Sequence, residues 1–389
     1  MKIAVPAEAE DTRVAATPDV VKRYVNAGAE VAIESGAGAD SRVTDEAYRE
    51  AGATIADSAE AAVSGADIIL TVRRPSAAVL GAAKRGAFLI GALDPYGDAD
   101  GMKAIADAGL AAVAMELMPR ITRAQSMDIL SSQANLAGYQ AVIDAASVYD
   151  RAIPMMMTAA GTVPAAKIFV MGAGVAGLQA IATARRLGGA VSATDVRPAA
   201  KEQVASLGAK FIAVENEEFK AAETAGGYAK EMSEDYRRQQ AELVAAHIAK
   251  QDIVITTALI PGRPAPKLIS AAMVASMNPG SVIVDLAVER GGNVEGAVPG
   301  DVVTVGPTTI IGHTNMQGRI AASASLLYAK NLYTFIDTVL LDKEKAFAPK
   351  WDDELMTATL LTKDGGLVHP KFGGTAPATA APQAASSAG

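Results

Sequence analysis

The sequence predicts an α/β protein of two domains, each built on a mainly parallel sheet that helices cover on both faces. Its 389 residues exceed the length of one ordinary domain. Hydrophobic residues make up 50% of the chain and 35 residues are glycine, whereas one is Trp and seven are Phe. This composition is typical of α/β cores made of small aliphatic side chains. Short apolar runs alternate with helical patterns, and this series starts twice along the chain.

The first series of alternating elements occupies the N-terminal part of the chain. Helical patterns lie at 18–28, 44–52 and 98–109, between apolar runs of strand character at 2–6, 30–34, 67–72, 88–93 and 109–117. Because most of these runs are apolar throughout, we expect parallel strands that are buried on both faces.

The second series restarts after Pro164 and follows a helix expected at about 128–150. A long amphipathic helix is expected at 319–339, and a weaker segment follows at 350–370. The strands of this series are expected at 167–172, 191–195, 211–214, 252–258, 281–287 and 308–312.

Two segments do not fit a compact domain. The connection 216–236 lacks a clear core periodicity and is either a solvated insertion or an active-site lid, since connections of this length are uncommon unless they are functional or disordered. The aromatic Tyr228, directly after Gly226 and Gly227, favours the lid. The tail 373–389 is uncharged and rich in Ala, Pro, Ser and Gly, and we expect it to be disordered.

Composition excludes several classes of function. A net charge of −8 and a pI near 5.1 argue against nucleic-acid binding and against a polybasic membrane anchor. The absence of Cys excludes disulfides, thiolate metal sites and cysteine nucleophiles, and no metal site is expected. No apolar run approaches the ~20 residues of a membrane helix, and the charged N-terminus is no signal peptide, so we expect a soluble, cytoplasmic protein.

A glycine motif for dinucleotide binding opens the second series. Gly172, Gly174 and Gly177 form GxGxxG between an apolar strand and a helix that starts at Val175. In this context the first Gly permits a tight turn, the second lets backbone approach a pyrophosphate, and the third lets helix and strand pack closely. The phosphates would lie at the helix N-terminus. A structural unit without a ligand is the weaker interpretation, because strand, motif, helix and second strand are all present.

Asp195 ends the second strand, close to the spacing at which a carboxylate binds the adenosine ribose. A carboxylate there would repel a 2′-phosphate, so NAD(H) is favoured over NADP(H), although Arg197 could bind such a phosphate. The loops 256–266 and 311–315 follow strands and should line the same site. His313, in the second of these loops, is expected to be a hydrogen-bonded structural residue.

A polar helix entrance lies in the middle of the chain. It contains Arg120, Gln125, Asp128 and Ser131, with no His, Cys or Lys beside them. From spacing alone, an ordinary helix start with Asp128 near the cap and a functional site are equally supported.

The chain resembles the NAD(H)-binding component of proton-translocating nicotinamide nucleotide transhydrogenase, up to about residue 372. The resemblance lies in RVAATP, RAQSMDILSSQANLAGY, MMMTAAGTVPAA, GAGVAGLQAIATA, TDVR, ETAGGYAKEM, TTALIPG and DLAVERGGN, and the RAQSMD and AGGYAKEM segments are its most specific parts. It implies two Rossmann-like domains separated by a cleft that holds NAD(H). The first would comprise 1–127 and 319–372, and the second 128–318 with a mobile loop at 216–236.

The resemblance also assigns site residues. Arg120, Gln125, Asp128 and Ser131 would surround the nicotinamide and its ribose, and Tyr228 would belong to the mobile loop. Hydride transfer between two nicotinamides releases no proton, so such a site needs positioning groups rather than a general base. The expected NAD(H)-binding residues are Gly172, Gly174, Val175, Gly177, Asp195, Val196, Arg197, Gly227, Tyr228, Thr257, Ala258 and Leu259.

The implied partners are an NADP(H)-binding component, a membrane subunit that carries protons, and a second copy of the chain in a homodimer. The chain would then be peripheral at the inner membrane. Two alternatives remain at this point. An alanine dehydrogenase is disfavoured because 72–75 read Val-Arg-Arg-Pro where that family has V-K-E-P, and no His precedes His247, although Arg13 is present. An NAD-sensing module would leave the RAQSMD segment without a purpose.

Overall fold

The chain forms two compact units in a computed structural model, which describes residues 1–221 and 232–374. The first unit comprises Met1–Ser132 and Ala321–Gly389, and the second comprises Gln133–Ile320. These limits lie a few residues beyond the expected 127/128 and 318/319. One of them falls inside α6 (Ile129–Val148), because the first turn of this helix packs with the first unit.

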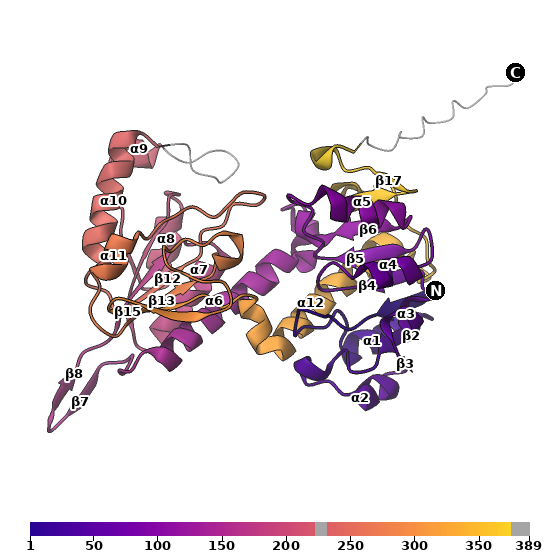
Figure 1. Ribbon diagram of the computed structural model, residues 1–389, viewed down its shortest axis with the longest axis horizontal. Coiled ribbons are helices and arrows are strands. Elements are labelled where there is room, and N and C mark those ends of the chain that lie inside the picture. Colours follow the sequence, from indigo (N-terminus) through magenta and orange to yellow (C-terminus); the bar gives the residue numbers. More distant parts are fainter. Residues whose placement is uncertain (222–231, 375–389) are drawn as a thin grey trace, which may run out of the picture. The chain divides into compact units, whose positions relative to one another are not determined.

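The first unit contains an eight-stranded sheet of order β17-β16-β6-β5-β4-β1-β2-β3 (Figure 1). The strands from β6 to β3 are parallel, whereas β16 and β17 are antiparallel and come from the C-terminal segment that looked weak in the sequence. The strands are β1 (Lys2–Val5), β2 (Glu30–Glu34), β3 (Thr54–Ala56), β4 (Ile68–Leu70), β5 (Phe88–Gly91), β6 (Ala111–Ala114), β16 (Leu360–Lys363) and β17 (Gly366–Leu367).

The longest helix of the first unit's C-terminal segment is α12 (Ala321–Phe335), which continues into a π-helical turn at Ile336–Leu340. Tyr328, Leu332 and Phe335 of α12 are fully buried in one core with the central strands. The other helices are α1 (Pro18–Asn26), α2 (Asp45–Glu50), α3 (Ala59–Val63), α4 (Ala77–Ala82), α5 (Ala99–Asp107) and α13 (Glu354–Thr359). A six-residue 3-10 turn, Thr122–Met127, precedes α6.

The second unit contains a seven-stranded sheet of order β11-β10-β9-β12-β13-β15-β14. The first six strands are parallel in the doubly wound Rossmann order, and β14 is antiparallel at the edge. The two mainly parallel sheets flanked by helices confirm the predicted fold class. The strands are β9 (Lys167–Met171), β10 (Ala190–Thr194), β11 (Lys210–Phe211), β12 (Ile253–Thr256), β13 (Ser281–Asp285), β14 (Val302–Val305) and β15 (Thr308–Ile311).

The helices of the second unit are α7 (Val175–Arg186), α8 (Ala200–Ser206), α9 (Glu217–Lys220), α10 (Glu234–Ile248) and α11 (Ala271–Ala275), together with most of α6. Gly138 of α6 lies so close to α7 that a Cβ there would stand 2.0 Å from the carbonyl oxygen of Ala176. This glycine therefore sets the distance between α6 and the start of α7.

A two-stranded hairpin, β7 (Met156–Thr158) and β8 (Gly161–Val163), projects away from the second unit's sheet (Figure 1). Its strands are exposed at every residue, and Met157 is 78% exposed. The sequence predicted no element here.

The expectation of a long segment without regular structure at 216–236 is wrong at both ends. Asn216 caps α9 and Ser233 caps α10, each by accepting a backbone N–H with its side chain. The carboxylate of Glu218 accepts hydrogen bonds from the N–H and the hydroxyl of Ser233, so it joins the two helix ends. Gly227 and Tyr228 lie outside the described residues, as does most of the tail 373–389.

Within residues 1–221 and 232–374, no helix is both long enough and apolar enough to cross a membrane.

Candidate functional site

The glycine loop between β9 and α7 has the geometry that a dinucleotide requires. Gly172 adopts a positive φ of 104°, where a side chain would be strained, and a Cβ there would stand 2.4 Å from the hydroxyl of Thr257. A Cβ at Gly177 would stand 1.8 Å from the carbonyl oxygen of Gly172, so only glycine allows this contact between helix and strand. A Cβ at Gly174 would meet no atom within 4 Å. The first and third glycines are thus required by packing, and the second leaves space.

The N-terminus of α7 points its backbone donors at that space. Gly174 is the N-cap residue and has no side chain to accept a hydrogen bond, and the carbonyl of Gly174 accepts from Leu178 at 2.8 Å. The N–H groups of the first helical turn have no partner within a helix, and together with the helix dipole they favour an anion. Val175, the first helical residue, is exposed.

Asp195 follows β10 and is held tightly by its neighbours. Its carboxylate accepts hydrogen bonds from the N–H of Ala173 at 2.7 Å and from the N–H and the guanidinium of Arg197 at 2.8–2.9 Å. Burial alone would raise the pKa of Asp195, but the hydrogen bonds from Arg197 and Ala173 outweigh it and lower that pKa. Asp195 is therefore an anion next to the glycine loop, and Arg197 serves as its counter-ion.

Arg197 is thereby engaged in a different contact from the one that the sequence left open. Both of its side-chain bonds to Asp195 come from one side of the guanidinium fork, Nε and Nη2, in a bidentate pair. Because Asp195 neutralises this charge, a 2′-phosphate would have to compete with the carboxylate for Arg197. This geometry favours a dinucleotide that carries ribose hydroxyls only.

The loop after β12 borders the glycine loop. The hydroxyl of Thr257 donates to the carbonyl of Gly172 at 3.1 Å, so the two loops are joined directly. Leu259 is 51% exposed, and Val196, in the loop after β10, is 62% exposed. These two apolar side chains stand on loops at the carboxyl edge of the sheet, where an adenine ring could cover them.

Sequence reasoning missed the residue that fixes this loop, Asn293. It is 0% exposed, and its amide accepts from the N–H of Ala258 at 3.0 Å while donating to the carbonyls of Ala258 at 2.9 Å and Pro266 at 2.8 Å. Asp285, also fully buried, supports the same region by accepting from the N–H groups of Ala287 and Val294. The signal was present in the motif DLAVERGGN, which begins with Asp285 and ends with Asn293.

The polar helix entrance contains one structural pair and two exposed side chains. Asp128 accepts from the N–H of Ser131 at 2.9 Å and from its hydroxyl at 2.6 Å, so it caps α6. The two explanations that the sequence left open are therefore not exclusive, because a capping Asp128 still presents a carboxylate and a hydroxyl together. The side chains of Arg120 and Gln125 are exposed and have no hydrogen-bond partner in the described part of the chain.

His313 has a charged neighbourhood inside the second unit. Its Nε2 lies 3.9 Å from a carboxylate oxygen of Asp144, and this carboxylate also binds Arg319 at 2.7 Å and Gln140 at 2.7 Å. Burial and the charge of Arg319 lower the pKa of His313, so the ring is predominantly neutral at pH 7. Its packing against this cluster suits a structural role.

The first unit has its own cluster of charges at the carboxyl edge of the sheet. The carboxylate of Asp11 is fully buried and binds Arg13 at 2.7 Å and Arg73 at 2.8 Å. Glu8 accepts from the N–H groups of Val72 and Arg73, and burial raises its pKa to about 7. Arg13 and Arg73 are thus neutralised by carboxylates of the chain itself.

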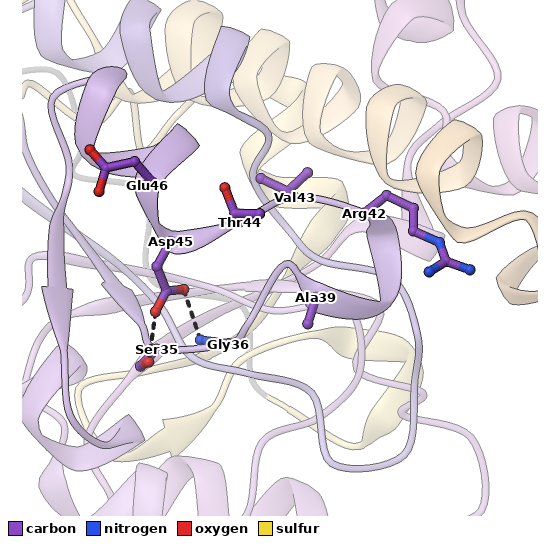
Figure 2. A pocket seen from close by; sticks show the side chains of 8 residues that line it. All are labelled: Ser35, Gly36, Ala39, Arg42, Val43, Thr44, Asp45 and Glu46. Carbon is purple, nitrogen blue, oxygen red and sulfur yellow. Dashed lines mark hydrogen bonds between the residues drawn. The ribbon is translucent and has the colours of Figure 1, made fainter.

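A surface hollow of about 650 Å³ lies in the first unit beyond β2 (Figure 2). The carboxylate of Asp45 inside it already accepts from the hydroxyl of Ser35 and the N–H of Gly36. None of the expected site residues lines it, so it does not define the function. Its lining residues are Ser35, Gly36, Ala39, Arg42, Val43, Thr44, Asp45 and Glu46.

The Rossmann strand order, the glycine loop and the buried carboxylate after β10 define a dinucleotide-binding α/β protein. Comparison with known proteins gives the family. Residues 4–137 match the sequence model of the alanine dehydrogenase/PNT N-terminal domain, and residues 141–370 match that of the C-terminal domain.

The chain therefore belongs to the alanine dehydrogenase/PNT family of oxidoreductases. It is 55% identical over 382 residues to a NAD(P) transhydrogenase subunit alpha of Rhodospirillum rubrum, and the match covers 96% of this chain and 99% of that one. It is similar to the crystal structure of transhydrogenase from Sinorhizobium meliloti, with a TM-score of 0.86, 60% identity and coverage of 95% and 100%. Alanine dehydrogenase of Mycobacterium tuberculosis is 30% identical, over 77% of this chain and 76% of its own length. Within the family the chain is an enzyme of the transhydrogenase branch.

Proposed function

We propose that the chain is the NAD(H)-binding component of a proton-translocating transhydrogenase and that hydride passes directly between its nicotinamide and that of NADP(H) on a partner subunit. The observation that carries the proposal is a polar segment with exposed Arg120 and Gln125 and an Asp128–Ser131 pair, in a chain whose second unit has the dinucleotide loop. The 55% identity to a transhydrogenase subunit supports the same assignment.

The described residues fit NAD(H). Gly174 leaves room beside the donors at the start of α7, where the pyrophosphate would lie. Asp195 would accept hydrogen bonds from the adenosine ribose hydroxyls, and Val196 and Leu259 would cover the adenine. Val175, Thr257 and Ala258 would contribute backbone contacts, and Gly227 and Tyr228 stay proposed contacts outside the described residues.

The chain's residues would orient the nicotinamide rather than exchange protons with it. Gln125 and Ser131 can bind the carboxamide, while Arg120 and Asp128 can fix the ribose. In the reaction a C–H bond at C4 of one dihydronicotinamide breaks and a C–H bond at C4 of the other nicotinamide forms. One ring is oxidised as the other is reduced, and no proton is released. A general base is therefore unnecessary, whereas alignment of the two rings is decisive.

The proposal implies partners, because the chain carries one dinucleotide motif. An NADP(H)-binding component and a membrane subunit that conducts protons would complete the enzyme, and the chain would associate peripherally with the membrane through them. We also propose a homodimer. The exposed hairpin β7–β8, with Met155, Met156 and Met157 at its start, is an apolar surface suited to a second copy of the chain.

An alanine dehydrogenase is the alternative that the charge cluster of the first unit argues against. Such an enzyme needs an arginine for the substrate carboxylate and a Lys and His for proton transfer. Arg13 is bound to Asp11, and the positions that would supply the Lys and His hold other residues. An NAD-sensing module remains the non-enzymatic alternative.

The test compares the chain alone with the chain mixed with an NADP(H)-binding transhydrogenase component. In fluorescence titrations we expect NADH to bind more tightly than NADPH, and we expect reduction of an acetylpyridine analogue of NAD to occur only after mixing. Gln125→Asn should slow this transfer more than it weakens NADH binding. Turnover by the chain alone with alanine or pyruvate would overturn the proposal, and binding without turnover after mixing would indicate a sensor.

A further inference from the structure

The segment that carries the four proposed nicotinamide contacts has little regular structure of its own. Between β6 and α6 it contains the 3-10 turn Thr122–Met127, a geometry with weaker hydrogen bonds than an α-helix. Gln125 belongs to this turn, and Asp128 is the residue after it. Its position must therefore be fixed by contacts from elsewhere in the first unit.

Such a contact comes from Asn331, about 200 residues further along the chain (|i−j| of 199 and 205). The side-chain Nδ2 of Asn331 donates to the carbonyl of Ser126 at 2.8 Å, and its Oδ1 accepts from the hydroxyl of Ser132 at 2.7 Å. A carbonyl oxygen can only accept, so the amide nitrogen must face Ser126 and the orientation of the amide is determined. Asn331 is 7% exposed, and both of its polar atoms are used.

The two bonds enclose the proposed contacts. Ser126 is the neighbour of Gln125, and Ser132 is the neighbour of Ser131, with Asp128 between them. One side chain therefore holds both ends of the turn that carries three of the four residues.

Asn331 is itself attached to a rigid element. It lies on α12, where Tyr328, Leu332 and Phe335 are fully buried in the core of the first unit. The hydroxyl of Tyr328 donates to the carbonyl of Thr71 at 2.9 Å, which ties α12 to the residue after β4. A displacement of the turn relative to the sheet would thus have to break the bonds to Asn331.

We infer that Asn331 is a positioning residue for hydride transfer, which sets the placement of Gln125, Asp128 and Ser131 through Ser126 and Ser132. The inference rests on the proposed function. Misplacement of a reacting group by about 1 Å can slow a reaction ~100-fold, while binding of the large dinucleotide depends mainly on other contacts.

The experiment uses the full chain mixed with an NADP(H)-binding transhydrogenase component. Single-turnover hydride transfer at saturating NADH and the Kd for NADH are measured for Asn331→Asp, Asn331→Leu and Ser132→Ala. Asp keeps the acceptor toward Ser132 but places an oxygen against the carbonyl of Ser126, and Leu removes both bonds at similar volume. We expect both Asn331 variants to slow transfer about tenfold or more with less than about a threefold change in Kd, and Ser132→Ala to slow it less.

The matched control is Ser325→Ala on the same helix. Ser325 is fully buried and bonds the N–H of Val14 and the hydroxyl of Ser41, so its loss costs stability away from the turn. Thermal unfolding is measured for every variant. Normal transfer in Ser325→Ala with slow transfer in the Asn331 variants supports the inference.

Transfer that falls in proportion to stability in all variants, the control included, would overturn the inference. Unchanged transfer in the Asn331 variants would also overturn it while leaving the proposed function intact. A wild-type chain that transfers no hydride after mixing would refute the proposed function and this inference with it.

Discussion

Two glycines of the same motif should respond to alanine in different ways. Gly174 and Gly177 lie three residues apart, but a Cβ at Gly174 would meet nothing within 4 Å, whereas a Cβ at Gly177 would stand 1.8 Å from the oxygen and 2.8 Å from the carbon of the Gly172 carbonyl. The backbone at Gly174, with φ −74° and ψ −167°, also suits an L-residue. Gly174→Ala should therefore disturb the ligand and Gly177→Ala the fold.

The magnitudes follow from these distances. At Gly177 the overlap exceeds 1 Å relative to an ordinary contact of 3.4–4 Å and involves backbone, so α7 and β9 must separate. Overpacking of this kind costs about 1–3 kcal/mol, against which alanine gains up to ~1 kcal/mol of helix propensity. At Gly174 the loss of one or two hydrogen bonds to the charged phosphates, about 1.5–3 kcal/mol each, raises the Kd for NADH roughly 10- to 100-fold or more.

The assays are thermal unfolding without ligand and NADH fluorescence titration. Gly174→Ala should keep the melting temperature of the wild type and bind NADH weakly. Gly177→Ala should melt lower, by about 2–4 °C per kcal/mol, and also bind weakly. Gly81→Ala in α4 is the control, since a Cβ there meets nothing within 4 Å, and it should keep both stability and affinity.

Normal NADH affinity in Gly174→Ala would refute the reasoning, because the pyrophosphate could then not lie against this loop. An unchanged melting temperature in Gly177→Ala would refute the packing argument.

Three further predictions concern the charges and amides around the sites. Asp195→Ser should weaken NADH binding and strengthen NADPH binding by releasing Arg197 toward a 2′-phosphate, so the ratio of the two Kd values should shift by about tenfold or more; an unchanged ratio in titrations would contradict this. Asn293→Ala should leave the N–H and carbonyl of Ala258 without partners in a fully buried place and cost about 2–4 kcal/mol in denaturant unfolding, together with weaker NADH binding; full stability would show that another group holds the loop. Burial raises the pKa of Glu116 to about 7, so the folded chain retains a proton that the unfolded chain releases near pH 4.5, and the free energy of unfolding should fall as pH rises between these values. Glu116→Gln should remove up to about 3 kcal/mol of this pH dependence, at 1.36 kcal/mol per pKa unit, and leave the contribution of Glu8; equal slopes of stability against pH in wild type and variant would exclude it.

Much of the fold could be predicted from the sequence because its signals are local. The runs at β1, β5, β9, β12 and β13 are largely apolar, and the glycine loop is defined by four neighbouring residues and the strand before it. The antiparallel strands were harder to predict. Leu360–Lys363 became β16 because it pairs with β6, some 250 residues earlier, and no local pattern encodes such a pairing.

The same distinction applies to the sites. Gly172, Gly177 and Asp195 could be assigned from spacing, because their roles depend on the local turn and on the next strand. Asn293 and Asn331 could not, since each acts by an amide that reaches a loop distant in sequence. A buried Asn in a helix, such as Asn331, reads in the sequence as an ordinary polar position.

The central claim is direct hydride transfer between two nicotinamides without a proton-transfer residue. NADH that carries deuterium at the transferred C4 position is mixed with the chain, an NADP(H)-binding transhydrogenase component and NADP⁺ in ordinary water, and the NADPH formed is analysed by mass spectrometry. The account predicts that the NADPH carries the deuterium in full, with none lost to water. Loss of the label to solvent, or turnover that requires an amino acid, would contradict it.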